Sequence, residues 1–213
     1  MVQVERFTFN LFAENTFVLW DDVNKEAAII DPGISTVEEQ KIITDFISSK
    51  NLTINYLINT HCHIDHILGC SFIKSNYKVI YYAPEKDLPL LGNANKQAQM
   101  FDIVFEEPPK PDKLISEETE LFLGNSKIKF LFTPGHTPGE FCLYLEKEKI
   151  CITGDVLFKE SIGRTDLWGG DYNTLIRSIE NKLLSLPDDV IIYPGHGEVS
   201  TIGYEKQYNP FLV

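Results

Sequence analysis

The stretch Thr60-His61-Cys62-His63-Ile64-Asp65-His66 holds three of the chain's five histidines and an aspartate. Residues i and i+2 of an extended segment point to the same side, so His61 and His63 are predicted to bind one metal ion together. Asp65 and His66 are expected on the bend into a following helix, where they face a neighbouring ion. Neutral imidazole and carboxylate are ligands that zinc, iron and manganese prefer.

The other two histidines, His136 and His196, each close a Pro-Gly-His tripeptide. The glycine lets the backbone turn sharply where a strand ends, and side chains at strand ends commonly converge on a shared cleft. Asp155 has the same setting, because the apolar residues 150–153 run into Gly154 and then into this carboxylate. A lone histidine is usually a packing or surface residue, but four ligand-type residues within six positions, with three more at strand ends, indicate a metal site.

The apolar pattern predicts an order of strands and helices. Strands are predicted at residues 2–9, 16–20, 27–30, 56–58, 120–123, 127–132, 141–145, 150–153 and 190–193. Helices are predicted from Ser35 or Thr36, around residues 88–100 and from Asp171, and residues 67–83 are predicted to form a second strand–helix unit. This order fits one α+β domain over residues 1–213, an αββα sandwich of two mixed β-sheets with helices on the outer faces. Other α+β arrangements remain open on the pattern alone.

Charge and cysteine usage limit the partners and the compartment. The chain has 19 basic and 31 acidic residues, so its net charge is 19 − 31 = −12, which repels nucleic acid and anionic lipid. No apolar run approaches the ~20 residues of a membrane span, and residues 1–6 carry charges where a secretory leader is apolar. The four cysteines stand singly, and Cys62 is predicted to pack away from the ligands on either side of it. We therefore predict a cytoplasmic protein with a small-molecule substrate and no nucleic-acid or membrane partner; the oligomeric state is open.

The segment His61-Cys62-His63-Ile64-Asp65-His66 resembles the HxHxDH element of the metallo-β-lactamase superfamily, and the resemblance extends from residue 30 to residue 196. It implies the αββα fold and two divalent metal ions, zinc first, with iron or manganese as alternatives. One ion would be bound by His61, His63 and His136, the second by Asp65, His66 and His196, and Asp155 would bridge them. By the resemblance Asp31 would support the ligands from behind; otherwise it is a simple turn residue.

Within the superfamily, the sequence is most similar to short single-domain relatives of glyoxalase II, the hydroxyacylglutathione hydrolase. The similarity lies in residues 133–139 (TPGHTPG), 154–158 (GDVLF) and 163–166 (GRTD). It implies a metallo-hydrolase whose metal-held hydroxide attacks a thioester of the hydroxyacylglutathione type. Asp65 would be both a ligand and the carboxylate that orients the nucleophile. Arg164 would bind a carboxylate of the substrate, or else it pairs with Asp166 and braces the loop.

Other functions compete with this one. Persulfide dioxygenases also resemble the sequence, including its GRTD segment, and would use one iron held by His61, His136 and Asp155. These dioxygenases keep the other ligand residues, so the motif alone does not separate the two functions. The hydrolase is preferred because all seven positions of a two-metal site are present, which also argues against a non-catalytic metal-binding protein. Antibiotic-degrading lactamases fit less well, because a bridging aspartate is not their pattern. Only a short tail follows His196, where full-length glyoxalase II has a helical domain that contacts glutathione, so glutathione specificity does not follow from the resemblance.

Overall fold

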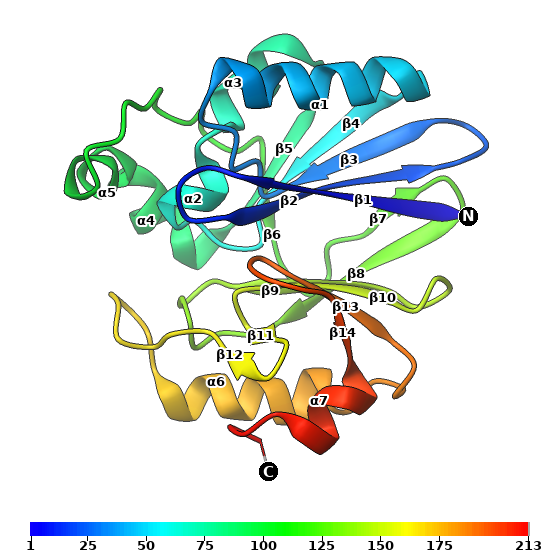
Figure 1. The fold of residues 1–213 in the computed structure, drawn as a ribbon, viewed down its shortest axis with the longest axis vertical. Helices are drawn as coiled ribbons and strands as arrows, with labels where there is room; N and C mark the ends of the chain where they lie inside the picture. Colours follow the sequence, from blue (N-terminus) through cyan, green and yellow to red (C-terminus); the bar gives the residue numbers. More distant parts are fainter. Residues whose placement is uncertain (213) are drawn as a thin grey trace.

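The computed structural model describes residues 1–212, which form two six-stranded β-sheets packed face to face with helices outside (Figure 1). The first sheet contains, in spatial order, β1 (Val2–Phe9), β2 (Glu14–Asp21), β3 (Glu26–Ile30), β4 (Thr53–Ile58), β5 (Ile80–Pro84) and β6 (Lys113–Ile115). The second contains β14 (Ser200–Thr201), β13 (Ile191–Pro194), β10 (Ile150–Gly154), β9 (Phe141–Leu145), β8 (Ser126–Phe132) and β7 (Leu121–Leu123). A small hairpin joins β11 (Leu157–Phe158) to β12 (Ser161–Ile162). The predicted αββα sandwich is confirmed.

Both sheets are mixed, as predicted. The strands β3, β4, β5 and β6 pair in parallel, whereas β1, β2 and β3 pair antiparallel. In the second sheet β10 and β13 are parallel and the remaining pairs are antiparallel. Consequently β8, β10 and β13 run in the same direction, and their carboxyl ends lie at one edge of the sheet.

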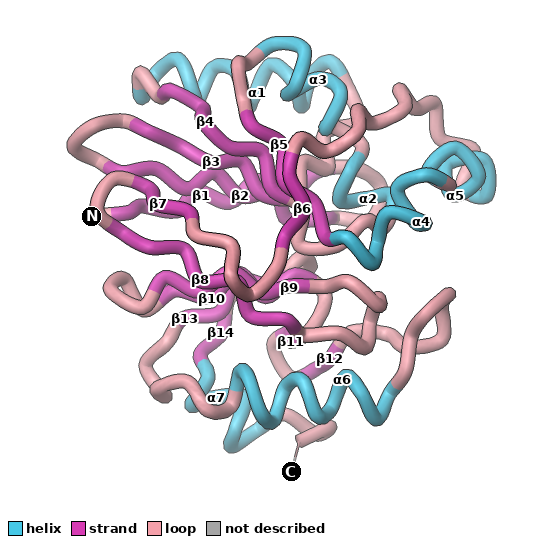
Figure 2. The backbone as a smooth tube through the Cα atoms, turned by 180° about the vertical axis from the view of Figure 1, so that it is seen from behind, coloured by secondary structure: helices cyan, strands magenta, loops and turns pink. Residues whose placement is uncertain are grey.

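Helices cover the outer face of each sheet (Figures 1 and 2). The first sheet is covered by α1 (Val37–Lys50) and α3 (Cys70–Asn76), and the second by α6 (Tyr172–Ser178), a π-helical turn (Ile179–Leu183) and α7 (Ile202–Tyr208). Three short helices, α2 (Ile64–Ile67), α4 (Leu88–Gly92) and α5 (Ala94–Met100), gather beside one edge of the sandwich. Of the two predicted starts of α1, the structure has Thr36, whose side chain and that of Glu39 cap each other's backbone N–H groups.

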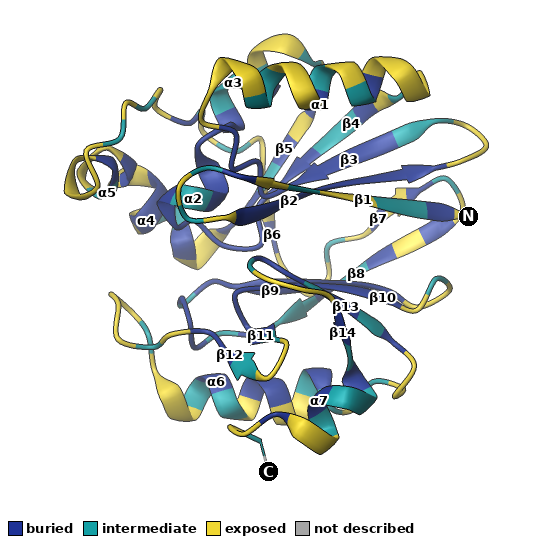
Figure 3. Ribbon diagram, in the orientation of Figure 1, coloured by how far each residue is buried: buried dark blue, intermediate teal, exposed yellow. Residues whose placement is uncertain are grey.

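The two faces of β2 contribute to different layers of the core, because successive side chains of a strand point to opposite faces. Phe17 and Leu19 pack between the two sheets. Val18 and Trp20 pack on the other side, in the layer under α1. A third layer, which includes Leu175, separates the second sheet from its helices. Figure 3 shows the result: most strand residues are buried, and exposed residues concentrate on the outer sides of the helices and in loops.

The structure corrects some expected elements. In residues 67–83 the helical part precedes the strand, because α3 is followed by β5. The predicted helix at 88–100 is interrupted at Asn93, which separates α4 from α5. The strands β6, β11, β12 and β14 were not predicted, since two or three residues carry no detectable periodicity. All four cysteines are buried and free, in line with the packing role predicted for Cys62. No helix among residues 1–212 is long and apolar enough to cross a membrane.

Candidate metal centre

The seven predicted ligands lie in four loops, and each loop follows the carboxyl end of a strand. The segment with His61, His63, Asp65 and His66 follows β4, and the last two of these residues sit in α2. In the second sheet His136 follows β8, Asp155 follows β10, and His196 follows β13. Because β8, β10 and β13 run in the same direction, their loops reach the same edge and meet the loop from the first sheet there.

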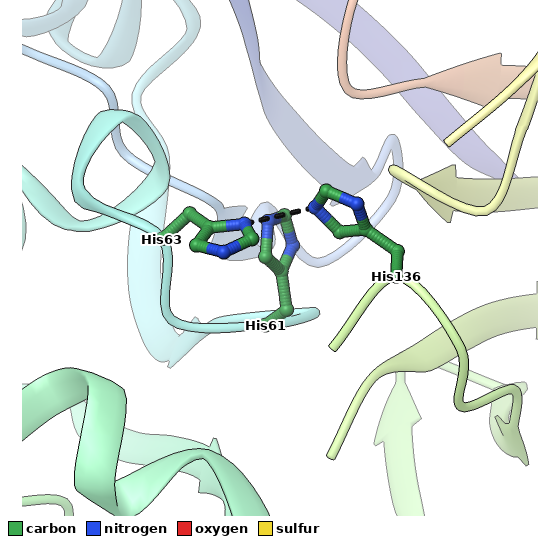
Figure 4. Close-up of side chains that lie close together, drawn as sticks. All are labelled: His61, His63 and His136. Carbon is green, nitrogen blue, oxygen red and sulfur yellow. Dashed lines mark hydrogen bonds between the residues drawn. The ribbon is translucent and has the colours of Figure 1, made fainter. Parts of the chain in front are cut away.

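Three of the histidines form a first group. The ligand atoms of His61, His63 and His136 all lie within 4.8 Å of one another. Nδ1 of His63 is 2.8 Å from Nε2 of His136, and the His61 ring lies between them in Figure 4. Its ring centroid is 5.0 Å from that of each of the other two. Three imidazoles that converge in this way present their nitrogens to one point, as a metal ion requires.

A second group lies beside the first. Asp65, His66 and His196 also bring their ligand atoms within 4.8 Å of one another. Oδ2 of Asp65 is 3.2 Å from Nε2 of His196 and 3.7 Å from Nε2 of His66. Asp155 contacts both groups: its Oδ2 is 3.5 Å from Nε2 of His136 and 3.6 Å from Nε2 of His196, and its Oδ1 is 3.4 Å from Nε2 of His66. Asp155 therefore occupies the position that a bridging carboxylate needs.

Hydrogen bonds behind the rings fix which nitrogen faces the centre. Nδ1–H of His136 donates to the carbonyl oxygen of Arg164 at 2.7 Å, and Nδ1–H of His196 donates to that of Phe12 at 3.1 Å. A carbonyl accepts only from a protonated nitrogen, so the neutral ring keeps its lone pair on Nε2, which faces the other ligands. Partners of this kind are typical of the histidines that bind metals.

Buried polar atoms without partners test whether these residues fit metal ions. Among the described residues, Nε2 of His61, Nε2 of His66 and Oδ1 of Asp155 are buried and have no hydrogen-bond partner. Buried polar atoms in folded proteins are nearly always paired, and leaving one unpaired costs about 1–3 kcal/mol. All three atoms belong to the two groups or to Asp155 beside them, and each can donate an electron pair to a cation once it carries no proton. The site fits divalent ions.

The two groups differ in charge. Burial, with the nearby charge of the other histidines, lowers the pKa of His61 well below its usual value and that of His63 to about 3, so both rings are neutral and ready to bind a cation. Burial also acts to lower the pKa of His66, but the carboxylates of Asp65 and Asp155 outweigh it and raise this pKa well above its usual value. In the second group a cation therefore has to displace a proton from His66.

Asp31 supports the centre from behind. Its carboxylate accepts hydrogen bonds from the backbone N–H and the hydroxyl of Thr60, at 2.7 and 2.6 Å, and its Oδ2 is 3.2 Å from Nδ1 of His66. Its ligand atoms also fall within 4.8 Å of those of His61 and His66, but each of its two oxygens already accepts a hydrogen bond from Thr60. The contacts fit the supporting role that the resemblance implies better than a simple turn residue.

Three buried acids behind the ligands were not predicted: Glu14, Asp87 and Glu140. Oε1 of Glu140 accepts from the backbone N–H of Asp155 at 2.7 Å and lies 3.5 Å from Nδ1 of His61. The carboxylate of Glu14 accepts from the Thr16 hydroxyl and lies 3.9 Å from Nδ1 of His66. No motif or periodicity distinguishes these residues from the surface acids of the chain, so only the packed structure reveals them.

Glu140 should make the stability of the metal-free protein depend on pH. Burial, reinforced by the charge of Asp155, raises the pKa of Glu140 well above its ordinary 4.5, so the folded chain keeps a proton that the unfolded chain releases. This stabilisation is full below pH 4.5 and is lost as the pH rises towards the raised pKa. Glu140→Gln is neutral at every pH. We expect the melting temperature of the metal-free variant, followed by circular dichroism with a chelator present, to fall less than wild type between about pH 5 and pH 8. Parallel curves for the two proteins would contradict this account.

Asp87 ties two ligand-bearing loops together. Its carboxylate accepts hydrogen bonds from the backbone N–H of Cys62, between the first two ligands, and from the Thr137 hydroxyl and the Gly139 N–H, just after His136. Burial raises its pKa to about 6 although these three donors lower it, so Asp87 is largely ionised at neutral pH.

We expect Asp87→Asn to destabilise the protein and loosen the first group. An amide offers one acceptor oxygen instead of two, so at least one buried donor loses its partner, at about 2–3 kcal/mol. That corresponds to a fall in melting temperature of about 5–10 °C, with metal affinity weaker by about 10–100-fold in competition with a chelator. The control is Asp45→Asn, an exposed residue paired with Lys41, which should change neither quantity measurably.

Arg164 pairs with Asp166, which is the alternative to substrate binding that the sequence left open. Its Nε and one Nη donate to the two carboxylate oxygens of Asp166, at 2.7 and 2.8 Å, and both side chains are more than half exposed. Arg164 also lines a pocket of about 540 Å³ that opens directly onto the metal centre, alongside His63, Asp65, His136, Asp155 and His196. Its role towards a substrate stays a prediction.

The sequence matches the metallo-beta-lactamase superfamily over residues 10–196. It is 40% identical over 213 residues to hydroxyacylglutathione hydrolase GloC of Haemophilus influenzae, covering 99% of this chain and 98% of that protein. The crystal structure of BLEG-1 B3 metallo-beta-lactamase is similar with a TM-score of 0.90 and 33% identity, covering 99% of this chain and all of that one (100%). That of TTHA1623 in a di-iron-bound form is similar with a TM-score of 0.87 and 30% identity, covering 98% and 100%. Fold, site and similarity agree: the chain belongs to the metallo-β-lactamase superfamily.

Proposed function

We propose that this chain is a hydrolase of thioesters of the hydroxyacylglutathione type, with two divalent metal ions, zinc first, bound by the seven side chains at the edge of the sandwich. The observation that carries the proposal is Asp155, whose carboxylate contacts members of both ligand groups. A site for one ion would use Asp155 only beside the first group, whereas here its carboxylate also contacts His66 and His196 of the second group. The similarity to hydroxyacylglutathione hydrolase GloC, at 40% identity over nearly the whole of both chains, supports the choice of a thioester.

Two divalent ions held by these side chains would supply a hydroxide from water near neutral pH and would polarise the carbonyl group of a substrate. The side chains of the protein supply the rest. Asp65, whose Oδ2 is 3.2 Å from Nε2 of His196, would serve both as a ligand and as the carboxylate that accepts a hydrogen bond from the attacking water and orients it. The backbone carbonyls behind His136 and His196 hold these rings in place. Hydrolysis adds water to the carbonyl carbon and breaks the C–S bond, and the thiolate is a fair leaving group without further acid catalysis.

Arg164 is the candidate for contact with a carboxylate of the substrate. The fork facing Asp166 uses Nε and one N–H of an Nη atom, which leaves other N–H groups of the guanidinium for a second acceptor. Arg164 lines the pocket that also contains the predicted metal ligands, which supports this role.

The proposal is tested by elemental analysis of protein purified without added metal, followed by a thioester assay. We expect two equivalents of metal per chain and hydrolysis of S-lactoylglutathione. One iron per chain with oxygen uptake on glutathione persulfide would replace the hydrolase by the dioxygenase, which needs only His61, His136 and Asp155. Hydrolysis of a β-lactam such as nitrocefin without thioester hydrolysis would overturn the substrate class, an outcome worth measuring given the similarity to BLEG-1.

A further inference from the structure

The pocket that opens onto the metal centre is walled by large apolar side chains on two sides. Phe12, Leu90, Met100 and Phe101 form the first wall, and Phe158, Ile162, Leu167 and Trp168 form the second. We infer that the substrate of this site is a thioester whose acyl group is apolar and longer than lactoyl, and that these walls bind its chain; the inference rests on the proposed thioester hydrolysis.

The first wall is fixed to the ligand-bearing loops. The rings of Phe12 and Phe101 meet edge to face, with centroids 4.9 Å apart, and the carbonyl of Phe12 holds His196. Gln97 of α5 accepts a hydrogen bond from the backbone N–H of Ile64, next to His63. Helix α5 and the phenylalanine that follows it are therefore tied to both sides of the metal centre, so an acyl chain on this wall is held at a defined place relative to the ligands.

The second wall comes from the hairpin of β11 and β12 and from the loop that follows it. Phe158 lies with its ring centroid 6.2 Å from that of His196, and Leu167 and Trp168 follow in the loop after Arg164. The side chains at the mouth are unusually exposed for their type: Trp168 is 58% and Met100 78% exposed. Large apolar residues grouped around a cavity mark a ligand-binding groove, because water contact with them is relieved when the ligand binds.

The pocket offers few charges that could recognise the glutathione moiety in particular. Among its lining residues the only cation apart from histidine is Arg164, and Asp166 already occupies its fork. Asp65 and Asp155 add negative charge. Glutathione carries two carboxylates, but the pocket offers them only the guanidinium of Arg164, which is already hydrogen-bonded to Asp166. The tail of an acyl group stays uncharged throughout hydrolysis, whereas the sulfur leaves as a thiolate, so the apolar walls suit the acyl side of the bond.

The experiment uses the metal-loaded protein and one thiol, N-acetylcysteamine, esterified with acetyl, butanoyl, hexanoyl and octanoyl groups. We expect kcat/KM to rise about threefold for each methylene that the walls bury. A second arm keeps the hexanoyl group and changes the thiol to glutathione, for which kcat/KM should change by less than about threefold. A kcat/KM independent of acyl length, or at least tenfold higher for S-lactoylglutathione than for the hexanoyl ester, would overturn the inference.

Substitution of two phenylalanines with similar exposed fractions tests whether the first wall causes the dependence of kcat/KM on acyl length. Phe101 is 48% exposed on the first wall, and Phe122 is 50% exposed on β7, away from the pocket. Phe101→Ala should reduce the octanoyl-to-acetyl ratio of kcat/KM by about tenfold, while Phe122→Ala leaves the ratio unchanged; Trp168→Ala tests the second wall in the same way. Equal ratios in the Phe101, Trp168 and wild-type proteins would count against the assigned walls. If no thioester is hydrolysed by protein carrying two metal equivalents, the proposed function itself fails, a result distinct from hydrolysis without preference for acyl length.

Discussion

We expect Asp155→Asn to reduce kcat/KM for a thioester by about 10³-fold and to lower the metal content from two equivalents per chain to one or fewer. The carboxylate contacts His136 of the first group and His66 and His196 of the second, so its removal weakens both. Burial acts to raise the pKa of Asp155, but the positive charge of His66 beside it outweighs burial and holds this pKa well below its usual value. An amide of the same shape carries no charge to attract two cations. Removing one preorganised electrostatic group from an active site lowers the rate by about 10²–10³-fold. The loss of a metal ion adds to this decrease.

A surface aspartate provides the matched control for this variant. Asp189 is exposed and pairs with Lys149 on the far end of β10, so Asp189→Asn should leave both kcat/KM and metal content at wild-type values. Circular dichroism of the metal-free proteins checks that both variants fold. Full metal content and activity in the folded Asp155→Asn protein would show that Asp155 bridges nothing.

The second large effect is expected from Gly195→Ala. A Cβ at Gly195 would lie 2.3 Å from Oδ1 of Asp155 and 2.7 Å from Cε1 of His66, far inside van der Waals contact. The methyl group would have to push the bridging carboxylate or a ligand of the second group aside. We expect loss of about one metal equivalent and a fall in kcat/KM of at least 10²-fold, since a displacement of about 1 Å is enough for that loss.

Substitution of Gly197, two residues further on, is the control that distinguishes steric crowding of the metal centre from backbone strain. Gly197 has a positive φ of 77°, but a Cβ there meets nothing within 4 Å. Gly197→Ala therefore introduces conformational strain of about 1–2 kcal/mol without entering the metal centre. It should lower the melting temperature by a few degrees and leave the metal content intact. If Gly197→Ala lost metal as completely as Gly195→Ala, the loop as a whole rather than the space at residue 195 would control the site.

Local chemistry made the ligands predictable from the sequence. His61, His63, Asp65 and His66 lie within six residues, so the geometry of a short extended segment and a bend is enough to bring them together. His136, Asp155 and His196 are distant in the chain, but each follows an apolar strand and a glycine, and strand ends of one sheet meet at its edge. The strand pattern fits the sandwich but left other α+β arrangements open without the resemblance, and the short strands β6, β11, β12 and β14 carried no signal.

The tertiary structure alone decided which acids stand behind the ligands and what surrounds the substrate. Glu140 and Asp87 resemble surface acids in the sequence, and burial between loops far apart in the chain gives them their contacts with the ligand loops. Arg164 was equally compatible with a substrate and with Asp166, and the folded loop shows the pair. The apolar pocket is built from side chains of both sheets' loops, so no local pattern describes it. Ligand spacing is a property of short segments, whereas burial and cavity shape depend on which segments pack together, and only the complete fold determines them.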